Sequence, residues 1–160
     1  MKKIKFIILY LEAWLGSAKA QFELGHIYRV DCGMPNEAID QFRLAAEQGH
    51  RDAQFQLGLI YDSHGAFQDY TEAAEWYRKA AEQGDVRAQY SIGFMYEYGG
   101  GVPQNYTEAE KWYRKAAEQG HRCAQFTMGY IYHTGRGVSK NHGEAEKWYR
   151  KAVAQGSADA

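Results

Sequence analysis

One segment of about thirty-five residues occurs four times along the chain. Its clearest marker is a Gln-Gly pair whose glycine returns at intervals of 35, 36 and 36 residues, at Gly49, Gly84, Gly120 and Gly156. A second marker is an Ala-Gln-aromatic run that leads to another glycine, and it begins at Ala20, Ala53, Ala88 and Ala124. A period of this size indicates a solenoid, because one unit cannot bury its apolar face unless a neighbour stacks on it. Such stacks present long surfaces, which suit the binding of a partner more than catalysis.

Composition narrows the classes of partner. The 160 residues are enough for one domain, and the formal net charge is −1. The sequence contains no basic stripe or polybasic run, so nothing in it supports binding to nucleic acid or to an anionic membrane surface. The two cysteines, Cys32 and Cys123, fall in the first and fourth copies. Stacked helices lie roughly 8–10 Å apart, so we expect these thiols to be too distant for a disulfide and to remain free.

Each copy has the periodicity of two helices. In the second copy, Ala53, Leu57 and Tyr61 recur on one helical face, and the adjacent Gly58 permits close approach of another helix. The second half of this copy carries another apolar stripe, formed by Ala73, Trp76, Tyr77, Ala80 and Ala81. We therefore expect each copy to be a helix hairpin.

Helix boundaries can also be predicted. Asp69, Asn105 and Asn141 are each followed three residues later by glutamate, which resembles a capping box at a helix start. The glycine of each Gln-Gly pair is the residue expected just past a helix end. No strand pattern is present, so we predict an all-α chain. Its helices are expected near residues 4–15, 19–30, 36–48, 52–62, 70–83, 87–98, 106–119, 123–133 and 142–155.

The first twenty residues allow two interpretations. Met1-Lys2-Lys3 and the apolar run that follows resemble a secretory signal. Against this, the uninterrupted apolar run is short, Glu12 interrupts the larger apolar stretch, and cleavage after Ala20 would cut the first repeat. We favour a cytoplasmic location, with a periplasmic or secreted one as the alternative if residues 1–20 act as a signal peptide. The segment is too short to span a bilayer, which takes about 20 apolar residues.

The extra helix expected over residues 4–15 is apolar on nearly all sides, and such a helix needs to be covered. One interpretation is self-association, which makes the chain a homodimer. The other is a cap that folds flat over the first repeat. The residues that would form the self-association surface are Phe6, Ile7, Tyr10, Leu11 and Trp14.

The sequence shows little sign of catalytic chemistry. His50 and His121 occupy the same turn in two copies, which makes them part of the repeat. His133 with His142, or His121 with Cys123, lacks a third ligand at a recognisable metal spacing. The glycine-rich run at residues 99–101 is not a phosphate loop, because no strand precedes it and no Gly-Lys-Ser/Thr follows. We therefore predict no enzyme activity, no cofactor and no metal.

The full pattern resembles the Sel1-like repeat family, a relative of the tetratricopeptide repeat. The shared run is Ala-x-x-x-Leu-Gly-x-x-Tyr, then Gly-x-Gly-Val, then Glu-Ala-x-x-Trp-Tyr-x-x-Ala-x-x-Gln-Gly. The third copy matches throughout, whereas the first has Gln41-Phe42 in place of Trp-Tyr. The resemblance implies an α/α right-handed superhelical solenoid, here a single domain over residues 1–160 with repeats near 18–51, 52–86, 87–122 and 123–156.

Members of this family, many of them bacterial, mostly serve as adaptors that assemble protein complexes. The resemblance therefore implies a scaffold that binds a peptide or protein partner. One alternative is a self-assembling architectural module. Another is a β-lactam-binding or β-lactam-hydrolysing protein like the Cys-rich branch of the family, although that branch carries a disulfide in each repeat and this chain does not.

In the tetratricopeptide architecture the first helix of each pair lines a concave groove. Carried over to this sequence, the resemblance marks positions that change between copies while the scaffold repeats, and these are free to encode a partner. We expect aromatic anchors, which are common interface hot spots, with charged neighbours for selectivity. One such position is aromatic in every copy and forms a Phe/Tyr row of Phe22, Phe55, Tyr90 and Phe126. The alternative for this row is packing between repeats. The predicted partner-binding residues are Phe55, Leu59, Asp62, Arg87, Tyr90, Phe94, Glu97, Phe126, Tyr130 and His133.

Overall fold

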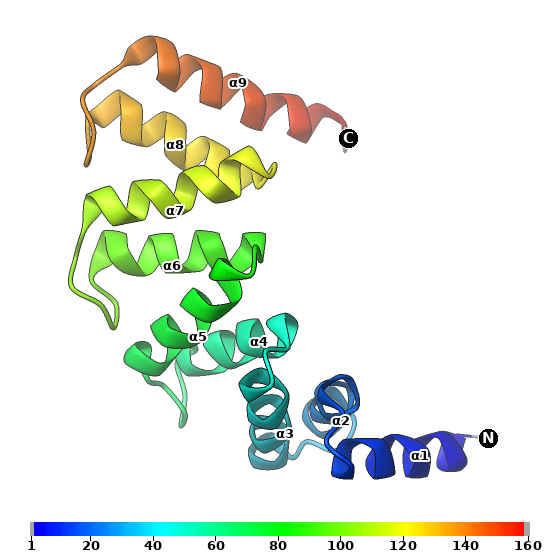
Figure 1. The fold of residues 1–160 in the computed structure, drawn as a ribbon. Helices are drawn as coiled ribbons and strands as arrows, with labels where there is room; N and C mark the ends of the chain where they lie inside the picture. The colour runs from blue at the N-terminus through cyan, green and yellow to red at the C-terminus, as the bar shows by residue number, and fades with distance from the viewer. Residues whose placement is uncertain (1, 159–160) are drawn as a thin grey trace. The chain divides into compact units, whose positions relative to one another are not determined.

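The described part of the chain folds entirely into helices and connecting turns (Figure 1). The computed structural model describes the backbone of residues 2–158 and the side chains of residues 7–154. Over these residues no strand is formed, and every helix expected from the sequence is present, so the all-α prediction is confirmed. The helices are α1 (Lys2–Trp14), α2 (Ala18–Val30), α3 (Pro35–Glu47), α4 (Arg51–Asp62), α5 (Tyr70–Glu82), α6 (Val86–Tyr98), α7 (Tyr106–Glu118), α8 (Arg122–Thr134) and α9 (His142–Ala158).

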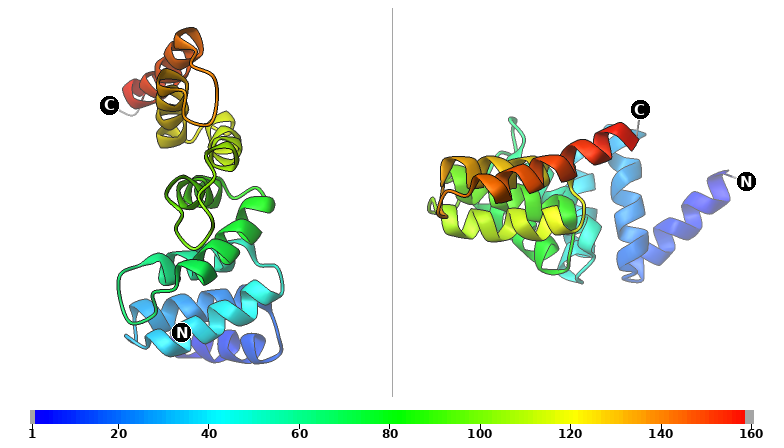
Figure 2. Two further views of the ribbon diagram at one scale, coloured as in Figure 1. Left: turned by 90° about the vertical axis from the view of Figure 1, so that its left-hand side faces the viewer. Right: turned by 90° about the horizontal axis from the view of Figure 1, so that it is seen from above.

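The chain forms two compact units, Met1–Gln68 and Asp69–Ala160. In the first, α1 packs on α2, α2 on α3 and α3 on α4. In the second, α5 to α9 pack in chain order, as the further views show (Figure 2). The expected single domain and its right-handed superhelix concern the arrangement of these units, and both stay predictions.

A buried glutamine joins consecutive repeats at four places. The side-chain Nε2 of Gln21, Gln54, Gln89 and Gln125 donates to a backbone carbonyl eight residues earlier, at Ala13, Ala46, Ala81 and Ala117, over 3.1, 3.0, 3.2 and 3.1 Å. Each bond links the first helix of one repeat to the helix before it. All four glutamines are buried, so their amides need partners inside the protein. The first of these bonds ties α1 to α2, and α1 therefore occupies the place of a second helix from a preceding repeat.

Glycine allows the two helices of a repeat to approach closely. A Cβ built on Gly93 of α6 would lie 2.9 Å from the Tyr113 ring of α7, and one on Gly129 of α8 would lie 2.6 Å from Tyr149 of α9. In the first unit, Gly25 of α2 meets Phe42 of α3 in the same way. The glycine at this position of the repeat therefore marks where a ring of the second helix rests on the first, and it permits the close approach that the sequence predicts.

Asp69, Asn105 and Asn141 start the second helices, as predicted. Asp69 and Asn105 each accept two backbone N–H groups with Oδ1, and Asn141 accepts that of Glu144 at 3.0 Å. The glutamates do not complete a capping box. Glu72 accepts from the Trp76 indole, while Glu108 and Glu144 pair with lysines one turn on. The backbone N–H groups of Asn105 and Asn141 donate to the carbonyls of Tyr96 and Tyr132.

The end of α9 differs from the prediction. Gly49, Gly84 and Gly120 have positive φ and lie just beyond their helices. In contrast, α9 continues through Gly156 to Ala158. In the other repeats the glycine leads directly into the N-cap of another helix, and that turn fixes its left-handed conformation.

The first helices of three repeats are capped by a histidine or an aspartate side chain. His50 and His121 accept the backbone N–H of Ala53 and Ala124 with Nδ1, each at 3.2 Å, so this nitrogen must be unprotonated. Asp85 caps α6 with its carboxylate. Burial lowers the pKa of His121. Burial alone would raise the pKa of Asp85, but hydrogen bonds from the Arg87 side chain and the backbone N–H of Ala88 outweigh it, and the pKa is lowered.

Replacing Gly93 with alanine should destabilise the second unit. The new methyl group would meet the buried Tyr113 ring, and overpacking of this kind costs about 1–3 kcal/mol. Urea unfolding monitored by circular dichroism measures the change. Gly143→Ala is the matched control, because its Cβ would meet nothing closer than 3.5 Å and alanine favours a helix. Equal stability of the two variants would contradict the close approach of α6 and α7.

Stability should fall as the pH is lowered below about 6.5, the ordinary pKa of histidine. In that window the unfolded chain binds a proton at His121, whereas the folded chain, with its lowered pKa, resists doing so. His121→Asp provides a cap that stays ionised, as at Asp85, and should reduce the fall between pH 7.5 and 5 by about 1 kcal/mol. Urea unfolding at both pH values measures it. An unchanged fall in the variant would mean that the His121 cap does not contribute.

Candidate functional site

The first helices of the second unit, α6 and α8, expose aromatic side chains. Phe94 on α6 is 50% exposed, and Phe126 and Tyr130 on α8 are 61% and 42% exposed. Large apolar side chains at helix interiors usually face a core, so a row of exposed rings on neighbouring first helices is a candidate contact surface. We call the exposed side of α6 and α8 that carries these three residues the aromatic face.

A pocket of about 740 Å³ opens beside Phe126. Its walls come from α6, α8 and α9, and its lining is mainly apolar. The lining residues are Tyr90, Arg122, Cys123, Phe126, Thr127, Ala152 and Val153. This volume suits one large side chain of a partner together with its flanking backbone.

Part of the Tyr90 ring packs against other aromatic rings. Its ring stacks on the His121 ring at a centroid distance of 4.8 Å and lies tilted against Tyr113 at 5.4 Å. Phe22 makes the same stack with His50 at 4.5 Å in the first unit. Burial raises the pKa of Tyr90. The alternative interpretation of the Phe/Tyr row, packing between repeats, therefore describes one side of Tyr90, while its other side lines the pocket.

Glu97 does not lie on the surface, contrary to the expectation that it supplies polar selectivity there. It is only 6% exposed, and it accepts hydrogen bonds from the Tyr113 hydroxyl at 2.8 Å and from Arg136 Nη1 at 2.7 Å. Burial and the Glu97 carboxylate raise the pKa of Tyr113, and the hydrogen bond to Glu97 raises that of Arg136. Because its carboxylate is used internally, we assign Glu97 to the scaffold beneath the aromatic face.

Arg87 and His133 lie at the two ends of the aromatic face. Arg87 is exposed and pairs with the buried Asp85, Nη2 to Oδ2, at 2.6 Å. His133 is exposed and packs edge-on against His142 at a centroid distance of 5.3 Å, beside a second pocket of about 620 Å³. Over the residues that the structure describes, no group of three His, Cys, Asp or Glu side chains is placed to hold a metal ion.

Three predicted binding residues belong to the first unit and are described with it. Leu59 and Asp62 are exposed on α4, whereas Phe55 is buried. Burial of Phe55 agrees with packing rather than with an open anchor. A groove that joins these residues to the aromatic face depends on how the two units are arranged, so it stays a prediction.

Among its described side chains, α1 packs against α2 with Leu9 and Ala13. Ala13 and Leu9 pack with Ala20 and Leu24 of α2, so α1 covers part of the first repeat. Most of the other described side chains of α1 are exposed, with Trp14 at 77%. Of the predicted self-association residues, Ile7, Tyr10, Leu11 and Trp14 are all exposed, and the Phe6 side chain lies outside the described residues.

Sequence reasoning missed two residues of this surface. Tyr98 is exposed on α6 and packs against Phe94 at a centroid distance of 4.5 Å. The i, i+4 spacing of these two rings was a signal that could have found it. Arg122 opens α8 and lines the large pocket, and no sequence marker distinguishes it from other arginines.

Comparison with known proteins identifies the repeat. The family model of the Sel1 repeat matches residues 18–50, 51–85, 86–121 and 124–157. No match is found among curated proteins. None of the described helices has the length and apolar character needed to cross a membrane.

Solved structures give the same result. A protective antigen present in uropathogenic Escherichia coli strains, which displays an SLR fold, is 43% identical with a TM-score of 0.86, over 94% of this chain and 33% of that one. A Sel1 repeat protein from Oxalobacter formigenes is 35% identical with a TM-score of 0.86, over 94% of this chain and 64% of that one. Helicobacter pylori cysteine rich protein B is 25% identical with a TM-score of 0.60, over 78% and 90%.

The chain thus spans about a third of the first relative and less than two thirds of the second. Four matched repeats cover most of its length. In each repeat, the glutamine that bonds to the preceding helix and the glycine that a ring contacts are seen in the structure or have an equivalent residue in the sequence. The resemblance found in the sequence is confirmed, and the chain belongs to the Sel1 repeat family.

Proposed function

We propose that this chain is a scaffold that binds a peptide or protein segment on the aromatic face of α6 and α8. Sel1 repeats generally mediate protein–protein interactions. The observation that carries the proposal is the exposure of Phe94, Phe126 and Tyr130 on the first helices α6 and α8. Phe94 and Tyr130 occupy a position whose residue type changes between repeats. Exposed rings provide large contact areas with few rotatable bonds, which is why they dominate interface energetics.

The helices that carry these rings are also held in place by buried contacts. Beneath them, Ile92 and Met128 are fully buried, and Glu97 links α6 to α7 and to the loop after α8. A surface whose backbone is held in this way loses little conformational freedom when a partner binds. Leu59 and Asp62 are exposed on α4 of the first unit, and a groove that includes them stays a prediction.

A second candidate is self-association through α1, which would make the chain a homodimer or a self-assembling module. Its supporting observation is the exposure of Ile7, Tyr10, Leu11 and Trp14 on one helix. Glu12 is the only charged residue among the described side chains of α1. A second copy of the same apolar surface complements it without burying many charges. The β-lactam alternative has no comparable support, since Cys32 and Cys123 are both free.

Alanine at Phe94 or Tyr130 should weaken partner binding and leave stability nearly unchanged. Removing an anchor ring costs about 1–3 kcal/mol of binding free energy, while an exposed substitution changes folding stability by less than about 0.5 kcal/mol. Binding to an immobilised peptide library and thermal unfolding of the same samples measure the two effects.

Ile92→Ala is the contrasting variant for this test. Ile92 is fully buried, so truncation should lower stability by about 2–5 kcal/mol. If Phe94→Ala and Tyr130→Ala lose as much stability as Ile92→Ala, their rings belong to the core. If they retain full peptide binding, the aromatic face is not the binding surface.

Trp14→Glu should convert a dimer to a monomer if α1 is the self-association surface. The carboxylate would be buried without a partner in the dimer, which disfavours association by several kcal/mol. Light scattering across a concentration series measures the mass. Val30→Glu places the same charge on an exposed apolar position of α2 and should leave the mass unchanged. Wild-type protein that stays monomeric at the highest concentration would rule out this candidate.

A further inference from the structure

Carboxylates are absent from the exposed side of the helices that form the aromatic face. Glu97 is the only acidic residue in α6 and α8, and it is buried. Asp85, which caps α6, is buried as well. Each is held by an arginine, Glu97 by Arg136 and Asp85 by Arg87. These guanidinium groups are partly exposed, so the charged atoms that reach solvent here are cationic.

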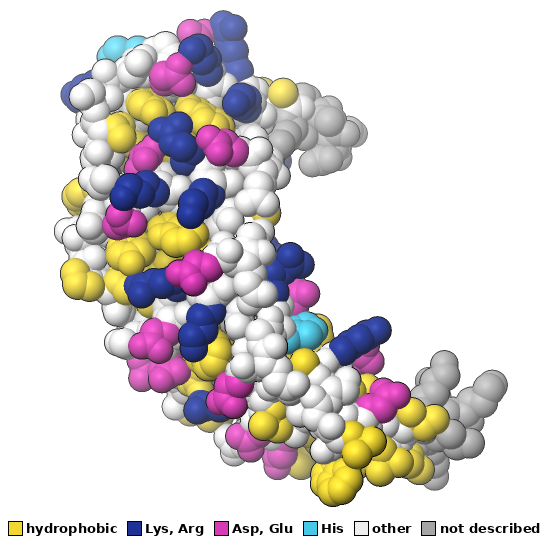
Figure 3. Space-filling model, in the orientation of Figure 1, with side chains coloured by type: hydrophobic (Ala, Val, Ile, Leu, Met, Phe, Trp, Pro, Cys, Tyr) yellow, Lys and Arg dark blue, Asp and Glu magenta, His cyan; other side chains and the backbone are white. Residues whose placement is uncertain are grey.

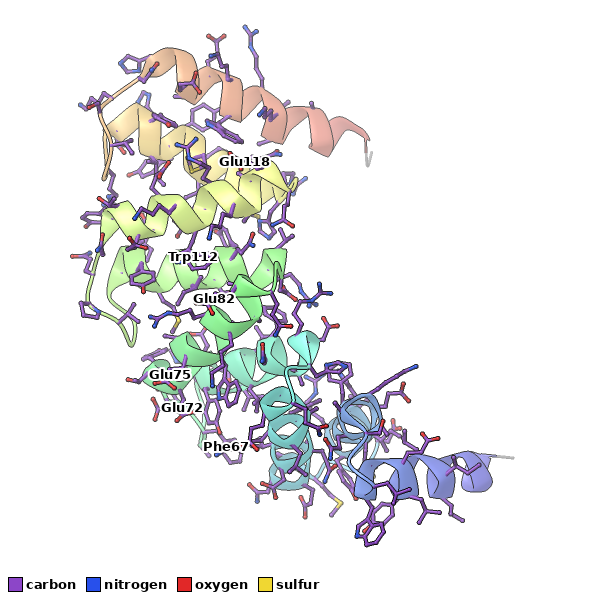
Figure 4. The ribbon with its side chains drawn as sticks, viewed as in Figure 1. Phe67, Glu72, Glu75, Glu82, Trp112 and Glu118 are labelled. Carbon is purple, nitrogen blue, oxygen red and sulfur yellow. The ribbon has the colours of Figure 1, made fainter. Side chains whose placement is uncertain are left out.

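The second helices, in contrast, carry both acidic and basic side chains. Helices α5, α7 and α9 contain eight glutamates, among which Glu72, Glu75 and Glu82 follow α5 and Glu118 lies near the end of α7 (Figure 4). On the face of the second unit turned towards the viewer, acidic and basic side chains are mixed (Figure 3). The second unit therefore keeps its exposed carboxylates on the second helices and away from α6 and α8.

The large pocket beside Phe126 combines an apolar lining with one cation. Arg122 is its only charged lining residue, and no carboxylate among the described residues lies within ion-pair distance of that guanidinium. Phe126, Val153 and Ala152 offer an apolar floor for a large side chain. A cation at the rim of an apolar pocket complements a partner that has a carboxylate next to a large apolar side chain.

We propose that the aromatic face binds an acidic peptide segment whose large apolar side chain enters this pocket while a neighbouring carboxylate pairs with Arg122. The inference rests on the proposed function and specifies the chemistry of its partner. Charge complementarity selects the partner: a basic segment would meet Arg87, Arg122 and Arg136 with no exposed carboxylate on these helices to pair with.

The test uses the full chain and three fluorescent peptides of equal length. The first is glutamate-rich with a central phenylalanine, the second replaces glutamate by lysine, and the third replaces the phenylalanine of the first by alanine. Anisotropy titration at low ionic strength should show the first binding roughly tenfold more tightly than either of the others. This preference should shrink as salt is added, because the pairing is between partly exposed charges.

Two variants locate the contact. Arg122→Gln should weaken binding of the acidic peptide roughly fivefold, and Phe126→Ala should weaken binding of both phenylalanine peptides. The matched control is Lys111→Gln, which removes an exposed cation from α7 and should have no effect. Circular dichroism of each variant checks that the helices are retained.

Each contrary outcome has a distinct meaning. Equal or tighter binding of the lysine peptide, lost in Phe126→Ala, would overturn the acidic-partner inference and leave the proposed function standing. No binding of any peptide to the wild-type chain would overturn both. A dimer that dissociates in Phe126→Ala would identify a second copy as the occupant and would also overturn the inference.

Discussion

A buried glutamine amide holds consecutive repeats in register, and most of the architecture depends on it. At all four junctions the Nε2 atom donates to a carbonyl near the end of the preceding helix. The Oε1 atoms of Gln21 and Gln89 accept from the glutamines of two Gln-Gly pairs, Gln48 and Gln119, at 2.7 Å. A buried amide left without partners costs about 1–3 kcal/mol, so a helix cannot slide along its neighbour without that loss. At the Gln21 and Gln89 junctions, one side chain therefore connects three successive helices.

This scaffold separates packing positions from variable ones. The glycine that receives the ring of the second helix and the alanines of the apolar stripe are repeated, because any larger residue would force the helices apart. The residue that directly follows this glycine is exposed in the second, third and fourth repeats, and there the type changes, from Leu59 to Phe94 to Tyr130. The Phe/Tyr row is intermediate: Tyr90 stacks on His121, and Phe126 is left largely open.

The elements and their caps could be predicted from the sequence because they depend on local chemistry: apolar period, N-cap residues and glycine turns. The roles of particular polar groups could not. Glu97 looks like a surface residue of a first helix, and its burial follows from Tyr113 and Arg136, which are 16 and 39 residues away in the chain. The glutamates of the expected capping boxes also differ from the prediction, because they bond to tryptophan and lysine side chains on their own helices. The pairing of Glu97 is long-range and leaves no mark in a local motif.

The two buried acid–arginine pairs are better explained by the geometry that they fix than by a contribution to folding stability. Burying a carboxylate costs several kcal/mol of desolvation, and pairing with arginine generally does little more than offset it. The pairs instead fix the positions of helix ends and of a loop. Asp85 caps α6, and Glu97 ties the loop after α8 to α6 and α7, so two acids that would otherwise reach the aromatic face are turned inward. The arginines they hold remain at its edge. The same contacts therefore fix the backbone beneath the exposed rings and set the sign of the charge beside them.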